Sequence, residues 1–272
     1  MKNRFPVCVV VYLTDFCSLK CKHCFLTQTN CLNKNKIDYL ILKDTIKTLK
    51  NNNVFMIAFT GGDPLLYPEL FNILDYTSEL GMMPLLGISG INVTKDISKR
   101  IYKSGVRCVQ IGLNGSNRDV NDFYRGHGSF DNSMDSIKNL QDANVNVNLS
   151  FCLDKNNLFD LKNMLDFAYK NNIYKVKIEF WNELNSANNK LTKLDKEDKQ
   201  HVIDTCELFM NINNNNDWIQ YPKISSNLGK IHSKALIIMP NGDVKSTETG
   251  VSLGNIYKEN IELIVGGVNN GK

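Results

Sequence analysis

Three cysteines occur close together near the amino terminus, in the stretch DFCSLKCKHCFL. Cys17, Cys21 and Cys24 have the spacing C-x3-C-x2-C. Thiolates are ligands of zinc and of iron–sulfur clusters, and both groups are closed by four protein ligands. Three thiolates on one loop therefore leave one iron of a cubane cluster, or one position on a zinc ion, open to another ligand. The alternative is a zinc site completed by His23 or by a distant residue.

A second group of candidate residues follows the next apolar run, in FTGGDPLLYPEL at residues 59–70. Gly61 and Gly62 can take backbone conformations that other residues resist, which lets the backbone come close to a ligand. Asp63 adds a carboxylate directly after them. Gly-Gly-Asp-Pro alone is also an ordinary turn. Its place after a predicted strand favours a functional site.

Polar residues at later predicted strands form a third group. VQIGLNGSNRDVNDFYRGHGSF, at residues 109–130, contains Asn114 and Arg125, and Ser89 ends the strand before it. In the following strand, alternation places four polar or small residues on one face: Asn146, Asn148, Ser150 and Cys152. Such residues are unexpected on a fully buried parallel strand, so they indicate a polar barrel lumen.

The cysteine stretch CSLKCKHCF is similar to the signature of the radical S-adenosylmethionine superfamily, C-x3-C-x-aromatic-C, with His23 at the aromatic position. The resemblance implies one [4Fe–4S] cluster held by Cys17, Cys21 and Cys24. It also implies that the amine and carboxylate of S-adenosylmethionine occupy the fourth iron. The ligand missing from the cysteine loop is then the cosubstrate.

The other two stretches extend this resemblance. GGDP is similar to the family's G-G-E-P segment, with Asp63 in place of Glu, which implies that Gly61, Gly62 and Asp63 receive the methionine amine. The third stretch resembles the SPASM-type subgroup, whose members modify peptides. That likeness implies that Arg125 meets the cosubstrate's carboxylate, with Asn114 where the subgroup usually has Asp. Ser89 and Ser150 are expected to contact the rest of S-adenosylmethionine.

The elements that position these residues alternate between strand and helix. Apolar, β-rich runs predict strands at 7–14, 54–60, 83–89, 106–114, 145–153 and 174–181. Helical periodicity predicts helices at 38–49, 68–80, 95–104, 130–143 and 158–170. This alternation predicts an α/β fold with parallel strands, a partial (β/α)6 TIM-like barrel. Functional residues of such a barrel lie at the carboxyl ends of its strands, where the cysteines are found.

The remaining residues predict a small C-terminal extension. We expect a core barrel at residues 1–190 and a degenerate SPASM- or twitch-like extension at 191–272, with a polar linker at 182–200. Residues 201–211 have a helical pattern, and 233–246 indicate a hairpin turning at Asn241-Gly242. Cys206 is the only cysteine after the core, so the extension cannot assemble an auxiliary cluster. The scattered cysteines of the core, Cys8, Cys31 and Cys108, have no spacing typical of metal ligands.

This lack of an auxiliary cluster bears on the reaction that the resemblance implies. A 5′-deoxyadenosyl radical removes a hydrogen atom from the substrate, and oxidising the substrate radical needs an electron acceptor. Without an auxiliary cluster, a redox-neutral outcome such as epimerisation is favoured. A thiol then returns a hydrogen atom, and Cys152, on the predicted lumen face, is the candidate catalytic donor. A free buried cysteine that only packs is the alternative.

Bulk properties limit the partners. The 272 residues carry a net charge of +4 with lysines dispersed, which predicts no nucleic-acid partner. No signal peptide or membrane span is recognisable, so we expect a cytoplasmic protein whose thiols stay reduced. A reducing partner such as flavodoxin or ferredoxin is expected. No separate leader-binding domain precedes the first strand, so recognition is expected at the barrel mouth or at residues 191–272.

The leading prediction for the substrate is a ribosomally synthesised peptide. A radical dehydrogenase or epimerase of a small sugar or antibiotic precursor is the runner-up. Two further readings are a non-catalytic metal-binding module, in which His23 completes a zinc site, and an enzyme remnant that binds S-adenosylmethionine without turnover.

Overall fold

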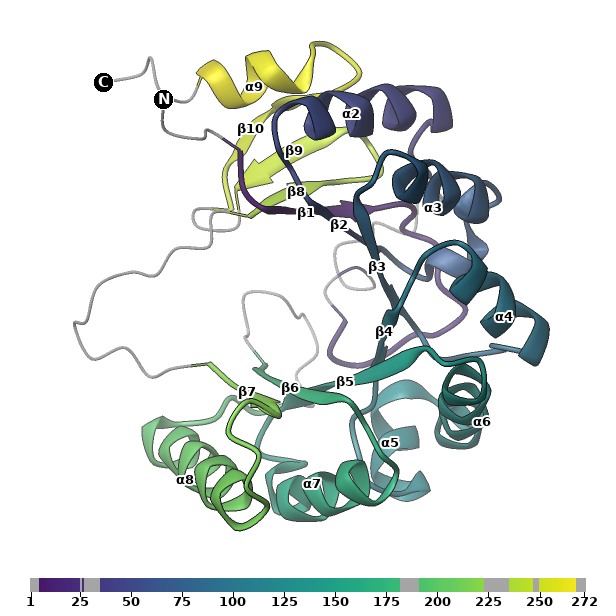
Figure 1. Cartoon of the computed structure of the whole chain (residues 1–272). Coiled ribbons are helices and arrows are strands. Elements are labelled where there is room, and N and C mark those ends of the chain that lie inside the picture. Colours follow the sequence, from purple (N-terminus) through teal and green to yellow (C-terminus); the bar gives the residue numbers. More distant parts are fainter. Residues whose placement is uncertain are drawn as a thin grey trace.

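A computed structural model of the chain describes residues 5–24, 26, 35–181, 191–222, 235–246 and 250–267. One ten-stranded sheet runs through these residues in the order β10-β9-β8-β1-β2-β3-β4-β5-β6-β7. The sheet curves into an open arc with helices on its convex side (Figure 1). The two edge strands do not pair with each other, so the barrel is not closed. This confirms the predicted α/β fold with a partial barrel.

The six central strands are parallel and follow one another in the sheet. They are β1 (Cys8–Tyr12), β2 (Met56–Thr60), β3 (Met83–Ile88), β4 (Cys108–Gly112), β5 (Asn146–Leu153) and β6 (Lys175–Phe180). Each lies within one of the predicted strands.

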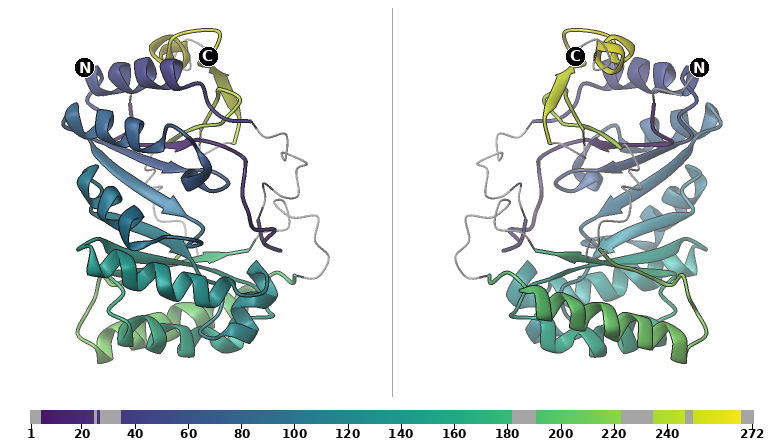
Figure 2. Two further views of the ribbon diagram at one scale, coloured as in Figure 1. Left: turned by 90° about the vertical axis from the view of Figure 1, so that its right-hand side faces the viewer. Right: turned by 90° about the vertical axis from the view of Figure 1, so that its left-hand side faces the viewer.

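The convex face is covered by helices from between these strands (Figures 1 and 2). They are α2 (Tyr39–Asn51), α3 (Leu70–Glu79), α4 (Lys95–Lys103), α5 (Arg118–Arg125), α6 (Ser129–Asp142) and α7 (Leu161–Lys170). Two 3-10 turns, η1 (Pro64–Leu66) and η2 (Leu158–Asp160), precede α3 and α7. All five predicted core helices are present, and α5 is an additional one.

Helix α5 is short and mostly polar, with Val120, Phe123 and Tyr124 as its apolar residues. Asn117 caps its first turn by accepting a hydrogen bond from the Val120 N–H at 3.1 Å. At its other end, the Asp122 carboxylate accepts from the Gly128 N–H at 2.6 Å and the Phe130 N–H at 2.8 Å. Side-chain hydrogen bonds therefore fix both ends of this short helix.

The last part of the chain extends both edges of the sheet. Helix α8 (Lys196–Ile212) leads to β7 (Ile219–Gln220) beside β6, whereas β8 (Leu236–Ile238) pairs in parallel with β1. Strands β9 (Asp243–Ser246) and β10 (Ser252–Asn255) continue from β8 in antiparallel fashion, and α9 (Ile261–Gly267) follows. The division of the chain into 1–190 and 191–272 stays a prediction.

Two local predictions in this part have different outcomes. The linker was expected to reach residue 200, but α8 already begins at Lys196, because Asp195 and Asp198 form a reciprocal capping box. Residues 182–190 of that segment lie outside the described residues. The hairpin prediction is confirmed by β8 and β9, where Gly242 has a φ of 84° that favours glycine.

Strand alternation separates an apolar core from a polar inner face. On β5, Val147, Leu149 and Phe151 are buried on the side of the helices. The intervening Asn148, Ser150 and Cys152 are only half-buried and face the inside of the arc. Fully burying one such apolar side chain stabilises a fold by about 1.5–3 kcal/mol, so the convex face holds the sheet together. The concave face is free for a site.

Across the described stretches, every helix is too short or too polar to pass through a lipid bilayer.

Candidate active site

The inner face of the arc contains a cavity of about 730 Å³ at the carboxyl ends of the parallel strands. Its lining includes most of the residues that the sequence singled out: Cys17, Cys21, Cys24, Gly61, Gly62, Ser89, Arg125, Ser150 and Cys152. Asp63 and Asn114 are not part of the lining; both are buried behind it. Side chains from the loop after β1 and from β2 to β6 thus meet in one place.

The cysteine loop is fixed by its backbone. The Lys22 N–H donates to the Tyr124 carbonyl at 2.9 Å, which ties the loop to α5. At its start, the Phe16 N–H donates to the Thr14 hydroxyl at 3.1 Å. Helix α5, which the sequence did not reveal, therefore supports the loop that carries the three thiols.

Of the three thiols, Cys21 is buried, whereas Cys17 and Cys24 are half-buried. Burial raises the pKa of Cys17 to about 11, although the Leu19 N–H, 3.4 Å from its sulfur, lowers it in part. Burial also raises the pKa of Cys21, which the positive charge of Arg125 partly offsets. Such thiols keep their protons until a metal replaces them, so metal binding here releases protons.

Gly61 and Gly62 allow the loop after β2 to pack directly on the cysteine loop. The Gly62 N–H donates to the Thr14 carbonyl and the Asp63 N–H donates to the Phe16 carbonyl, both at 2.7 Å. A Cβ on Gly62 would lie 2.1 Å from the Phe16 oxygen, and one on Gly61, whose φ is 143°, would lie 2.3 Å from the Thr14 oxygen. Both glycines are therefore required by the close approach of two backbones.

Arg125 is a buried cation without a carboxylate partner among the described residues. Its side chain is 7% exposed, and its Nη2 donates to the Ser89 carbonyl at 3.0 Å. Its Nη1 lies 3.4 Å from Asn114 Oδ1, whereas Nε has no hydrogen-bond partner in the described parts. Gly112 makes room for it, since a Cβ there would lie 2.4 Å from Nη1. A buried, incompletely bonded guanidinium that faces a cavity suits an anionic ligand.

Asp63 contributes from behind the cavity wall. One of its oxygens accepts from the Ser89 hydroxyl and the other accepts from the Leu65 N–H at 3.2 Å. Burial raises the pKa of this carboxyl group, and the hydrogen bonds and Arg125 counteract the rise. Asp63 and Asn114 therefore act on the cavity through Ser89 and Arg125.

His23 lines the cavity beside the cysteines as a neutral ring. Burial and the charge of Arg125 lower its pKa to about 3, and its Nδ1 has no partner within the described part of the chain. No three Cys, His, Asp or Glu side chains of the described residues lie close enough together to bind a single ion. A four-iron cluster needs no such convergence, because each thiolate binds a different iron. The thiol set fits a cluster better than a zinc ion completed by His23.

Cys152 lines the cavity from β5. Its carbonyl accepts from Asn114 Nδ2 at 3.1 Å and from Asn157 Nδ2 at 3.0 Å, which fixes the backbone at this position. Burial, followed by the negative charges of Glu179 and Asp154, raises the pKa of its thiol to about 12. Cys152 therefore carries its hydrogen at neutral pH.

Cys31, which the sequence analysis named among the scattered cysteines, lies outside the described residues.

Strand β6 supplies residues that the sequence analysis missed. Lys177 and Glu179 line the cavity and form an ion pair, with Nζ 2.6 Å from Oε1. Ser150 Oγ lies 3.4 Å from the other carboxylate oxygen. The alternation in KVKIEF, which resembles that of NVNLSFCL on β5, was the available signal.

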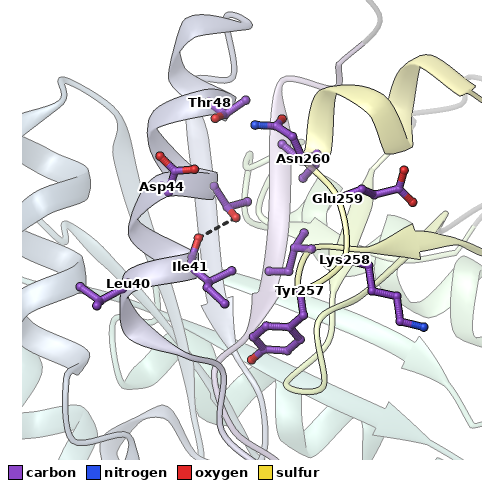
Figure 3. A pocket seen from close by; sticks show the side chains of 11 residues that line it. Leu40, Ile41, Asp44, Thr48, Tyr257, Lys258, Glu259 and Asn260 are labelled. Carbon is purple, nitrogen blue, oxygen red and sulfur yellow. Dashed lines mark hydrogen bonds between the residues drawn. The ribbon is translucent and has the colours of Figure 1, made fainter.

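A second pocket of about 470 Å³ lies between α2 and the turn that precedes α9 (Figure 3). Its walls carry Asp44 and Thr48 from α2 and Tyr257, Lys258 and Glu259 from the turn. The Thr45 hydroxyl that lines it is already used, since it donates to the Ile41 carbonyl at 2.8 Å. It contains no cysteine and no unpartnered buried polar atom of the described residues.

Comparisons with known proteins agree with the geometry. The Fe-coproporphyrin III synthase of Methanosarcina barkeri is 28% identical over 176 residues, covering 64% of this chain and 44% of the relative. The mycofactocin maturase MftC of Mycobacterium tuberculosis is 29% identical over 164 residues, covering 60% and 42%. The chain thus spans less than half the length of these curated relatives.

Solved structures share the fold at low sequence identity. Streptococcus suis SuiB, bound to the precursor peptide SuiA, has a TM-score of 0.81 at 17% identity, covering 99% of this chain and 68% of SuiB. The enzyme anSMEcpe with bound AdoMet has a TM-score of 0.76 at 14% identity, covering 94% and 79%. The model of the radical SAM superfamily matches residues 11–168, more than half of the chain. The chain therefore belongs to the radical SAM superfamily, whose cofactors are a [4Fe–4S] cluster and S-adenosylmethionine.

Proposed function

We propose that this chain uses the cavity to generate a substrate radical and that its substrate is a ribosomally synthesised peptide. The observation that supports this most strongly is that three thiols and a buried Arg125, which has no carboxylate partner among the described residues, share one cavity with the polar side chains of β5 and β6. This arrangement offers metal ligands, an anion site and a substrate surface within one volume.

The residues divide by what they would hold. Cys17, Cys21 and Cys24 bind the cluster, and Arg125 binds the carboxylate of S-adenosylmethionine. Gly61 and Gly62 offer backbone atoms to the methionine end. Asp63 and Asn114 are positioning residues, because they reach the cavity only through Ser89 and Arg125. Ser89 and Ser150 face the remainder of the cosubstrate.

When bound, the cofactors supply a carbon radical that removes a hydrogen atom from the substrate. This chain then has to decide the fate of the substrate radical. A redox-neutral outcome, epimerisation, follows if the Cys152 S–H returns a hydrogen atom to the opposite face of that carbon. The raised pKa of Cys152 keeps that hydrogen in place. The resulting thiyl radical is restored by one electron from the external reductant and one proton from water.

The peptide assignment draws on two neighbours by name, the maturase MftC and SuiB with its precursor peptide. A small-molecule substrate is the second candidate, because Fe-coproporphyrin III synthase and AdoMet-dependent heme synthases are also similar to this chain. The polar β5–β6 wall favours the peptide, since it offers hydrogen bonds rather than the apolar surface that a macrocycle covers.

Anaerobic reconstitution tests the proposal. We expect about four irons per chain and release of 5′-deoxyadenosine when dithionite and S-adenosylmethionine are added. Alanine at Cys17, Cys21 or Cys24 should abolish release. Cys108→Ala is the matched control, because Cys108 is also half-buried but does not line the cavity. Bound zinc, or deoxyadenosine from a cysteine variant, would refute the assignment.

A further inference from the structure

A buried donor at the end of β6 has no use in the cofactor assignments. Trp181 is 5% exposed and lines the cavity, yet its indole Nε1–H has no hydrogen-bond partner in the described part of the chain. Buried polar groups of native proteins are nearly always hydrogen-bonded, so an unpaired one that faces a cavity points to a ligand acceptor. Trp218 shows the usual pattern, because its Nε1–H donates to the Ile173 carbonyl at 2.8 Å.

Trp181 directly follows β6 and continues the strand face that carries Lys177 and Glu179. The three residues alternate along the chain and all line the cavity. Lys177 bonds one oxygen of Glu179 at 2.6 Å, whereas from the described residues the other oxygen receives only the long contact from Ser150. That second oxygen still has a lone pair for a donor from a ligand. Within the described residues, the wall therefore offers an unpaired donor at Trp181 and an acceptor with spare capacity at Glu179.

The charges on this wall select the kind of ligand. Lys177 and Glu179 together are neutral, so neither a carboxylate nor an ammonium gains net attraction from the pair. A neutral group that carries both an acceptor and a donor fits the two free positions. One residue of an extended peptide is such a group, because its own carbonyl and N–H point to the same side, the carbonyl toward Trp181 and the N–H toward Glu179.

The same wall adjoins Cys152. Cys152 is opposite Glu179 in the β5–β6 register. The backbone N–H of Trp181, as distinct from its indole N–H, donates to the Leu153 carbonyl at 2.8 Å. Cys152 also packs against the small hydrophobic cluster of Tyr124, Trp181 and Leu191. A peptide residue held by Trp181 and Glu179 consequently lies beside the thiol.

We propose that Trp181 and Glu179 form a substrate subsite that binds the backbone carbonyl and N–H of one extended peptide residue next to Cys152. This inference rests on the proposed function and specifies how its substrate is recognised. Recognition through the backbone holds the modified residue in place whatever its side chain.

The two tryptophans of the chain provide the test. In the reconstituted protein with ¹⁵N-labelled tryptophan, only Trp181 and Trp218 give indole N–H signals. Titration with acetyl-trialanine amide should shift the Trp181 signal and leave that of Trp218 unchanged. Acetate and methylammonium, which carry a single charge, should shift neither signal.

Three results would overturn the subsite. They are an unmoved Trp181 signal, an equal response to the charged probes, and a Trp181 shift caused by S-adenosylmethionine alone, which would assign the donor to the cosubstrate. Deoxyadenosine formation is measured on the same sample. If it is absent, the proposed function fails; if it is present while Trp181 does not respond, only the subsite fails.

Substitutions give a second measurement on the acetyl methyl signal of the probe. Trp181→Phe keeps a ring but removes the donor, and Glu179→Gln keeps the shape but replaces the acceptor charge. Each should weaken probe binding about tenfold, the loss of one hydrogen bond to a buried or charged partner. Phe159→Leu, at an exposed position outside the cavity, is the control that should bind as the parent does. Unweakened binding in both subsite variants would contradict the proposal.

Discussion

The two walls of the cavity are built in different ways. The wall that carries the thiols is held by backbone hydrogen bonds and by glycines that admit no side chain, as at Gly61 and Gly62. The wall formed by β5 and β6 presents half-buried side chains such as Ser150 and Glu179, whose mutual contacts are few. The residues of the first wall therefore tolerate almost no substitution. Side chains of the second wall can be substituted, and the ligand that it binds can change, while the sheet stays the same.

The largest expected effect is on the first wall. Gly62→Ala would place a Cβ 2.1 Å from the Phe16 carbonyl, so the cysteine loop has to move and cluster assembly should be lost. Iron per chain after reconstitution measures this. Gly87→Ala is the control, since its Cβ would be 3.4 Å from the Thr60 hydroxyl, an ordinary contact. Full iron content in Gly62→Ala would show that the glycine wall is not rigid.

The next effect concerns the buried cation. Arg125→Met should leave the iron content unchanged and weaken S-adenosylmethionine binding about 10- to 100-fold, because a charge-assisted hydrogen bond contributes about 1.5–3 kcal/mol. Equilibrium binding to the reconstituted protein measures it. Asn114→Ala should weaken binding less, since Asn114 reaches the cavity only through Arg125. Unchanged affinity in Arg125→Met would remove Arg125 from the cofactor site.

On the second wall, Cys152→Ala should separate hydrogen abstraction from hydrogen return. Deoxyadenosine formation should persist, while deuterium uptake from heavy water into the modified peptide should fall at least about tenfold. Mass spectrometry of peptide and nucleoside from one reaction measures both. Equal deuterium uptake would exclude Cys152 as the donor, and its absence in the parent protein would favour oxidation over epimerisation.

The smallest effect is expected where the two walls are joined. The Tyr124 hydroxyl donates to Asp154, a carboxylate that is 1% exposed. Tyr124→Phe should lower the free energy of unfolding by about 1–3 kcal/mol, because it leaves a buried acceptor short of one partner. Denaturant unfolding measures this. Iron content should be retained, since the Tyr124 carbonyl that holds Lys22 belongs to the backbone and is kept in the variant. A loss of iron would show that the Tyr124 hydroxyl also positions the cysteine loop.

The wall that carries the thiols was also the easier of the two to predict from the sequence. Cys17, Cys21 and Cys24 and the glycine pair are visible as spacing, and the strands beneath them as apolar runs, because tight backbone packing restricts residue type. Helix α5 was missed because side-chain caps from Asn117 and Asp122 define it. The unpaired indole of Trp181 depends on what surrounds it in three dimensions, which no local pattern records.

The electron paramagnetic resonance spectrum of the dithionite-reduced cluster, with and without S-adenosylmethionine, tests the central claim most directly. If the cosubstrate completes the site that three cysteines leave open, its addition should change the g values in the parent protein. The same concentration should change them much less in Arg125→Met. A reduced cluster whose spectrum is identical with and without saturating S-adenosylmethionine would contradict this account of the cavity.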